Sequence, residues 1–281
     1  MEITYLGTAA AEGIPGIYCG CETCRRAIAA GGRNIMTRSQ ALIDGKLLID
    51  LGSDTYMHFL RLGRTMYDIE HVLITHSHAD HFAYNEMSLR PAGMAHGVTA
   101  ERLKIYAEAA LAGKIAAETE RQHMMSAELF DTCFQTVPLT PYVTVDAGGY
   151  AVTPLPAQHP APEQPLIYLI ERGGKTLFYG NDTGLFGTDI DDWLCANGKH
   201  IDVLSLDCTK EDNPFDYNSH MSMAENKALA DRFAARGLID GNTKRIMTHF
   251  SHNGHMIYDD LVKHAEKYGF AVAYDGLTVT L

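Results

Sequence analysis

The chain has 281 residues, 46% of them hydrophobic, and a formal net charge of −12. A chain of this length and composition buries a full core, so we expect one α/β domain over residues 1–281 that needs no disulfide framework. The acidic balance, with no Lys/Arg run longer than Arg25-Arg26, argues against nucleic acid and anionic membranes as partners. The first twenty residues contain no basic segment followed by an apolar one, and no window approaches eighteen uncharged apolar residues, so we expect a cytoplasmic protein.

The first half of the chain contains short apolar runs separated by helical patterns. Strands are predicted at residues 3–6, 40–43, 46–50 and 71–75. A helix is predicted at 54–62, and helices at 84–94 and 108–125 flank a further strand at 104–106. The region from about 92 to 141 has no clear counterpart elsewhere, and a lid or a dimer element is the interpretation we give it.

The second half repeats this alternation. Strands are predicted at residues 150–155, 166–171, 176–179, 203–207, 245–248 and 271–273, with helices at 221–235 and 257–268. Strands grouped in each half, with helices between and outside them, predict an α/β sandwich of two mixed β-sheets packed face to face and covered by helices. Histidines and aspartates then fall in loops at strand ends, where a scaffold commonly presents functional groups.

Residues 76–81 have the pattern H-x-H-x-D-H, directly after the strand predicted at 71–75. Imidazole and carboxylate groups are ligands for Zn²⁺, Mn²⁺ or Fe²⁺, and a turn can direct them towards two neighbouring points. The alternative is a solvated polar loop, which rarely contains four ligand-type residues in six. The motif residues are His76, His78, Asp80 and His81. Further candidate ligands stand at later strand ends: His159, Asp182 and His249.

This order of motif, lone histidine, aspartate and late histidine resembles the metallo-β-lactamase superfamily over nearly the whole chain. The resemblance implies a hydrolase with two divalent metal ions, Zn²⁺ or Mn²⁺. It implies a first site of His76, His78 and His159, a second site of Asp80, His81 and His249, and Asp182 as the bridge. Asp50 matches an early Asp-x-Gly strand end, where it either supports a metal ligand through a hydrogen bond or forms a turn.

Three of the six cysteines, Cys19, Cys21 and Cys24, lie within six residues, a clustering that favours metal over disulfides. Together with His252, three residues after the last ligand histidine, they resemble the extra zinc site of the phosphonate-utilisation phosphodiesterase branch of the superfamily. His255 lies close enough in sequence to compete for the fourth position, and free thiols remain the alternative. The scattered cysteines are expected to be small buried hydrophobic residues.

His220 falls where that branch carries a general acid, and a positioned histidine protonates a leaving group near neutral pH. The resemblance thus makes Asp80 and His220 the catalytic residues. Without it, His220 would be an exposed loop residue beside a helix capped by Ser219 or Ser222.

The predicted function is hydrolysis of a phosphodiester in a small or cyclic nucleotide-like substrate, with no membrane involved. A thioesterase or lactonase type of carboxyl hydrolase, a tRNA 3′-processing-like nuclease and a non-catalytic binding protein are the alternatives, because one fold supports many chemistries. Nucleic acid is disfavoured as a partner, and a homodimer is left open.

Overall fold

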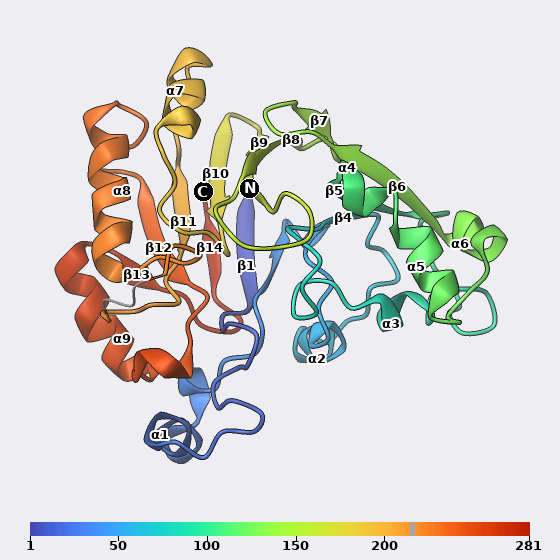
Figure 1. The fold of residues 1–281 in the computed structure, drawn as a ribbon, viewed down its shortest axis with the longest axis horizontal. Coiled ribbons are helices and arrows are strands. Elements are labelled where there is room, and N and C mark those ends of the chain that lie inside the picture. The colour runs from blue at the N-terminus through green and yellow to red at the C-terminus, as the bar shows by residue number, and fades with distance from the viewer. Residues whose placement is uncertain (214–216) are drawn as a thin grey trace.

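A computed structural model describes residues 1–213 and 217–281 (Figure 1). Two seven-stranded sheets form its centre. The first sheet runs in the order β14 (Thr278–Thr280), β1 (Glu2–Gly7), β2 (Gln40–Ile43), β3 (Leu47–Ile49), β4 (His71–Leu73), β5 (Leu103–Glu108), β6 (Phe134–Leu139). The second runs in the order β13 (Ala271–Val272), β12 (Lys244–Thr248), β11 (Val203–Asp207), β10 (Lys175–Gly180), β9 (Leu166–Arg172), β8 (Ala151–Pro156), β7 (Val145–Asp146).

Both sheets are mixed. In the first, β14, β1, β2 and β3 pair antiparallel, whereas β3 to β6 are parallel. In the second, β7 to β10 pair antiparallel, whereas β10 to β13 are parallel. Parallel strands need long connections between them, and these connections supply most of the helices.

The helices lie outside the sheets and between the strands in sequence. The α-helices are α1 (Glu22–Ala30), α2 (Thr55–Arg61), α3 (Tyr84–Met87), α4 (Ala109–Ala112), α5 (Ile115–Arg121), α6 (Ala127–Cys133), α7 (Asp189–Ala196), α8 (Met223–Ala235) and α9 (Tyr258–Ala265). Short 3₁₀ helices are η1 (Gly32–Asn34), η2 (His252–Gly254) and η3 (Glu266–Tyr268). No helix in the described residues is long and apolar enough to cross a bilayer.

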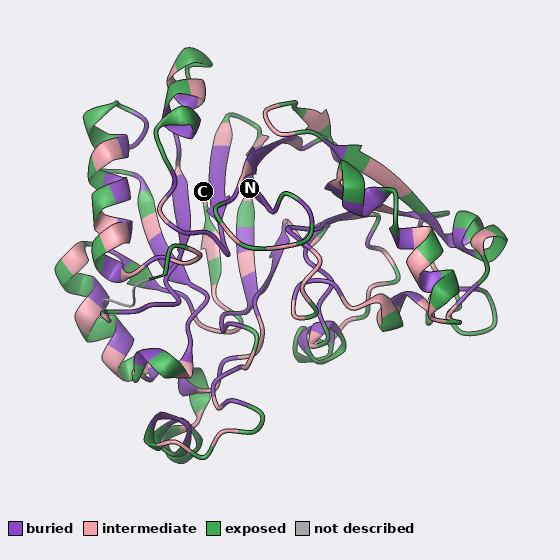
Figure 2. Ribbon diagram, viewed as in Figure 1, coloured by how far each residue is buried: buried purple, intermediate pink, exposed green. Residues whose placement is uncertain are grey.

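One apolar core lies between the two sheets, where the central strands are buried on both faces (Figure 2). Along β9, Leu166, Tyr168 and Ile170 point towards the first sheet, while Ile167 and Leu169 point towards the helices. This alternation follows from the two-residue period of a strand. The predicted face-to-face sandwich is therefore confirmed.

Separate apolar clusters hold helices against the outer face of each sheet. Side chains of α7, α8 and α9 cover the second sheet, and α2 to α6 cover the first (Figure 1). Helix α8 begins after Ser222, which forms a capping box with Glu225 and so fixes the segment that precedes the helix. The helix predicted from residue 221 thus starts two residues later.

Two helices predicted in the first half were wrong in extent. The segment predicted at 84–94 is helical only in α3, because Pro91 and Gly93 interrupt the pattern. The segment predicted at 108–125 is divided at Gly113 into α4 and α5, and Glu108 ends β5 and caps α4. Edge strands β6, β7 and β14 and helices α1, α6 and α7 were not predicted.

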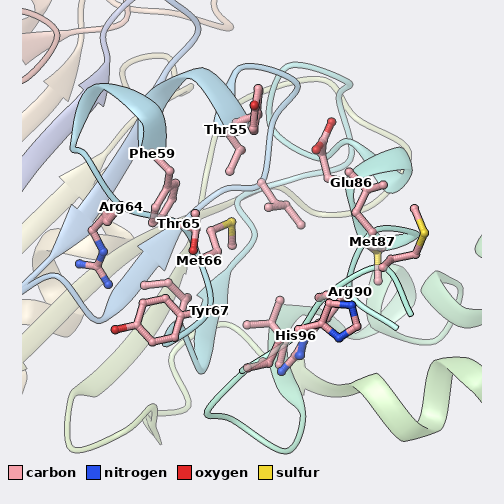
Figure 3. A pocket seen from close by; sticks show the side chains of 18 of the residues that line it. Thr55, Phe59, Arg64, Thr65, Met66, Tyr67, Glu86, Met87, Arg90 and His96 are labelled. Atoms are coloured by element: carbon pink, nitrogen blue, oxygen red, sulfur yellow. The ribbon is translucent and has the colours of Figure 1, made fainter. Parts of the chain in front are cut away.

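Helices α2 to α6, which cover the first sheet, are short. A cavity of about 440 Å³ remains on this outer side of the sheet. Figure 3 shows Phe59, Met66 and Met87 around it, with polar groups of Glu86 and Arg90 beside them. No residue of the segment 76–81 is among the described residues that line it. This cavity is therefore separate from the cluster of histidines described next.

Candidate metal centre

Several strands end near one point and deliver the predicted ligands to it. β4 leads into the segment 76–81, β3 into Asp50, β10 into Asp182 and β12 into His249. Asp50, Asp182 and His249 have φ angles of 68°, 53° and 64°, a left-handed conformation that few non-glycine residues adopt. Such angles cost about 1–3 kcal/mol each, so the surrounding structure must hold these turns in place.

The turn that carries the H-x-H-x-D-H motif is fixed from two sides. His81 N–H donates to His78 O at 2.9 Å, and Leu51 N–H, at the end of β3, donates to His81 O at 2.8 Å. On the other side, Glu163 accepts hydrogen bonds from Ser77 N–H at 2.6 Å and from Ser77 Oγ at 3.0 Å. Glu163 thus fixes the position of Ser77 in the middle of the motif, and the sequence analysis missed this residue.

Three imidazoles meet in a first cluster of His76, His78 and His159. His78 Nδ1 lies 2.9 Å from His76 Nε2 and 3.3 Å from His159 Nε2. Nitrogen ligands of a tetrahedral ion, with bonds of 2.0–2.1 Å, lie about 3.3 Å apart. The spacing of these nitrogens therefore fits three ligands that converge on one ion.

A second cluster contains Asp80, His81, Asp182 and His249. Asp182 Oδ2 lies 2.5 Å from His81 Nε2 and 3.3 Å from His249 Nε2. The same oxygen is 3.6 Å from His76 Nε2, which belongs to the first cluster. Asp182 therefore lies between the two clusters, at the position that the sequence analysis gave to a bridging ligand.

Two of the remaining ring nitrogens are held from outside, which fixes which nitrogen of each ring faces its cluster. His81 Nδ1 donates to Asp50 Oδ2 at 2.7 Å, and His159 Nδ1 donates to Ser219 O at 3.1 Å. Outer hydrogen bonds of this kind orient metal-binding imidazoles and fix their tautomers. Asp50 also accepts from Thr75 N–H at 2.8 Å, so it both supports a ligand ring and holds a turn.

Asp207 is a buried carboxylate of the site that the sequence analysis missed. Its Oδ2 lies 2.8 Å from His220 Nδ1 and 3.4 Å from His249 Nδ1, and its Oδ1 accepts from Met221 N–H at 3.0 Å. An aspartate at the end of an apolar strand was the available signal, although Asp207 lacks the Asp-x-Gly pattern that pointed to Asp50. The side chain joins the late ligand histidine to the predicted general acid.

The centre concentrates negative charge in a buried place. Four largely buried carboxylates belong to it: those of Asp50, Asp80, Asp182 and Asp207. In the part of the chain that the structure describes, their ion-pair partners are histidines and never Lys or Arg. Burial opposes ionisation of Asp182, but His249 and His81 hold the pKa of this carboxyl well below its usual range.

Several buried polar atoms at the centre have oppositely charged neighbours nearby but make no well-directed hydrogen bond within the described residues: His81 Nε2, His249 Nε2 and Asp182 Oδ1. Buried polar atoms of this kind are costly unless a partner completes them. Divalent cations would supply both the missing partners and the missing positive charge. The donor set of imidazoles and carboxylates therefore fits divalent metal ions.

The cysteine cluster forms a separate site at the start of α1. Cys19 Sγ and Cys21 Sγ each lie 3.7 Å from His252 Nδ1, and Cys24 completes the group. In a tetrahedral zinc site, with bonds of about 2.3 Å to sulfur and 2.0–2.1 Å to nitrogen, such atoms lie about 3.6 Å apart. His255 is not part of this group among the described residues.

Backbone N–H groups donate to two of the thiols in this cluster, but the pKa values of the two thiols shift in opposite directions. Cys24 N–H donates to Cys21 Sγ at 3.5 Å, and this hydrogen bond lowers the pKa of Cys21 to about 6. Gly16 N–H donates to Cys24 Sγ at 3.3 Å, but burial outweighs this hydrogen bond and raises the pKa of Cys24 to about 12. No disulfide forms among the six cysteines.

Comparison with known families agrees with the fold and the donor set. Residues 46–274 match the model of the beta-lactamase superfamily domain, and the chain belongs to this superfamily, in its metallo-β-lactamase form. It is thus a metal-dependent hydrolase. No curated protein matches the sequence significantly.

Solved structures with the same fold cover almost the whole chain. A diphosphatase from the PhnP family is 20% identical, with a TM-score of 0.71 over 99% of this chain and 97% of that one. Zn²⁺-bound PqqB from Methylobacterium extorquens is 22% identical, with a TM-score of 0.68 over 100% of both chains. The short form of human tRNase Z is 17% identical, with a TM-score of 0.64 over 100% of this chain and 99% of that one.

We expect Gly52→Ala to damage the centre, because a Cβ at this position would lie 1.9 Å from Asp80 O. The backbone of the motif must then move, at an expected cost of about 1–3 kcal/mol in the free energy of unfolding. Urea unfolding and elemental analysis of bound metal measure the effect. Gly187→Ala is the matched control, because nothing lies within 4 Å of its Cβ. Wild-type stability and metal content in Gly52→Ala would show that this close approach is dispensable.

Proposed function

We propose that this hydrolase is a binuclear phosphodiesterase that acts on a small or cyclic nucleotide-like substrate. Zn²⁺ or Mn²⁺ would occupy two catalytic sites, one held by His76, His78 and His159 and the other by Asp80, His81 and His249, with Asp182 between them. A further structural zinc would be held by Cys19, Cys21, Cys24 and His252. That the protein is cytoplasmic and that it forms a single domain remain predictions, and whether it forms a homodimer stays open.

A pocket of about 360 Å³ opens over the two clusters. Its size suits a small molecule rather than a folded partner. The residues that line it include Asp80, Asp182, His220 and His249. Divalent ions bound in the two clusters would neutralise phosphoryl oxygens and lower the pKa of a water molecule. Asp80, whose carboxylate reaches the pocket, would accept a hydrogen bond from that water.

The observation that carries the proposal is the environment of His220. Its Nδ1 donates to Asp207 Oδ2 at 2.8 Å, and its ring lies 5.0 Å from that of His159 and 5.6 Å from that of His249. Burial disfavours the charged ring, but Asp207 and then Asp182 outweigh burial and raise the pKa of His220 to about 9. The hydrogen bond to Asp207 thus orients the ring beside the centre, where it would serve as the proton donor that we propose. An alkoxide leaving group needs such a donor, whereas a thiolate does not.

The rival functions fit this pocket less well. A thioester would make little use of the paired His220 and Asp207, because its thiolate leaves without protonation. The likeness to human tRNase Z concerns the fold, and the described residues that line the pocket include no Lys or Arg to bind a polynucleotide. A small diester is therefore the substrate class that we propose.

The predicted metal content is about three divalent ions per chain after reconstitution, falling to about two in Cys21→Ser, because a structural zinc site needs its four ligands. Elemental analysis of the purified protein checks this. Cys195→Ser is the control, because Cys195 is free and lies outside the cluster. Equal metal contents in wild type and Cys21→Ser would remove the structural zinc from the proposal.

Replacement of His220 tests the proposed chemistry. We expect His220→Asn to lower the turnover of 2′,3′-cyclic AMP, which has an alkoxide leaving group, by about 10²–10⁴-fold. The loss should be much smaller for bis(4-nitrophenyl) phosphate, because nitrophenolate leaves without protonation. Steady-state kinetics on protein of measured metal content gives both numbers.

The control for this variant is His200→Asn, since the side chain of His200 is 48% exposed and lies outside the pocket. An unchanged rate on the cyclic ester, with metal retained, would count against His220 as the acid. Absence of diester turnover in the wild type, together with hydrolysis of a thioester or lactone, would overturn the phosphodiesterase proposal itself.

A further inference from the structure

One wall of the catalytic pocket is built by two loops that the cysteine cluster brings together. Residues 10–12 precede the cysteines, and Ser251 and Asn253 flank His252. Glu12 lies at the junction: its Oε1 accepts a hydrogen bond from Ser251 Oγ and lies 3.8 Å from His252 Nε2. Ser251 and His252 thus hold the carboxylate in place, and the Glu12 side chain, which is 29% exposed, lines the pocket.

No lysine or arginine neutralises Glu12 within the described residues. Arg38 donates to a backbone carbonyl of this wall, but it pairs with Asp54 at 2.9 Å. Lys210 pairs with Glu225 at 2.7 Å. The basic residues beside the pocket are thus already occupied by other carboxylates.

Glu12 is an unusual group to find beside a site for a phosphate ester. The proposed ions would balance the charge of the scissile phosphodiester and of the carboxylates that hold them. A second phosphate placed near Glu12 would meet an uncompensated negative charge, with no basic side chain to offset the repulsion. A hydroxyl group placed there would instead donate a hydrogen bond to an ionised acceptor, which is among the stronger hydrogen bonds in proteins.

We propose that Glu12 sets the substrate selectivity of this pocket by accepting a hydrogen bond from a substrate hydroxyl group and by excluding a further phosphate. The inference rests on the proposed phosphodiesterase function and refines it. The substrate class is a diester with one phosphate and a neighbouring polyol such as ribose, rather than an oligonucleotide or a polyphosphate.

Three chromogenic probes differ only in the group that would face Glu12. Each carries a 4-nitrophenyl ester on its 5′-phosphate. The parent nucleotides are uridine 5′-monophosphate, its 2′,3′-dideoxy analogue and uridine 3′,5′-bisphosphate. Metal-loaded wild type should prefer the uridine ester to the dideoxy ester by about tenfold, through KM rather than kcat, because the hydrogen bond forms on binding. It should disfavour the bisphosphate ester.

Two variants separate the acceptor from the charge. Glu12→Ala, which removes the acceptor, should bring the ratio of uridine to dideoxy ester close to one. Glu12→Gln keeps an acceptor without the charge, so it should keep part of that ratio and lose most of the discrimination against the bisphosphate ester. Glu101→Gln is the control, because it makes the same charge change at an exposed position outside the pocket.

Two further measurements test this inference separately from the proposed function. Turnover of bis(4-nitrophenyl) phosphate reports on the phosphodiesterase function alone, because this diester has no hydroxyl group. Calorimetric titration of uridine 5′-monophosphate and its dideoxy analogue tests Glu12 even if no diester is hydrolysed. Three outcomes would each overturn the inference. The first is a wild-type ratio of uridine to dideoxy ester in both variants, and the second is no preference for the hydroxyl groups in the wild type. The third is loss of bound metal in Glu12→Gln.

Discussion

The structure depends on the burial of one carboxylate, that of Asp182, among five imidazoles. Its oxygens lie 2.5 to 3.8 Å from the nitrogens of His76, His81, His159, His220 and His249. An ionised carboxylate that is 3% exposed costs several kcal/mol unless positive charge and hydrogen bonds compensate it. His81 and His249 supply part of that charge, and divalent ions bound in the clusters would supply it when these rings act as ligands. The Nδ1 atoms of His81 and His159 are bound to Asp50 and Ser219, so their Nε2 atoms face the clusters, where cations would complete the centre.

This constraint explains why both sheets are needed. The H-x-H-x-D-H turn follows β4 of the first sheet, whereas His159, Asp182 and His249 come from loops of the second. The ligands of either cluster therefore meet only after the two sheets have packed face to face. The left-handed turns at Asp182 and His249 are maintained by that packing, so strain at the site is offset by the apolar core between the sheets.

The sequence predicted those parts of the site that lie together in the chain or recur in the family. The contiguous motif was recognisable by itself, and the family resemblance assigned the scattered ligands, which no local pattern connects. Asp207 and Glu163 escaped because each acts through another residue. Asp207 ends β11 and Glu163 lies in a loop, and neither position shows which residue the carboxylate will contact. Helical periodicity overestimated two helices because it does not register the interruptions at Pro91 and Gly113.

The cysteine cluster has a consequence for the pocket as well as for stability. His249 and His252 stand on one short loop after β12, so the proposed catalytic ion and the proposed structural zinc hold the same backbone three residues apart. Ser251, between them, is 4% exposed and holds Glu12 at the wall of the pocket. A shift of this loop would move a metal ligand and the pocket wall together. A zinc in the cysteine cluster would therefore fix the shape of the substrate site, although it takes no part in the chemistry.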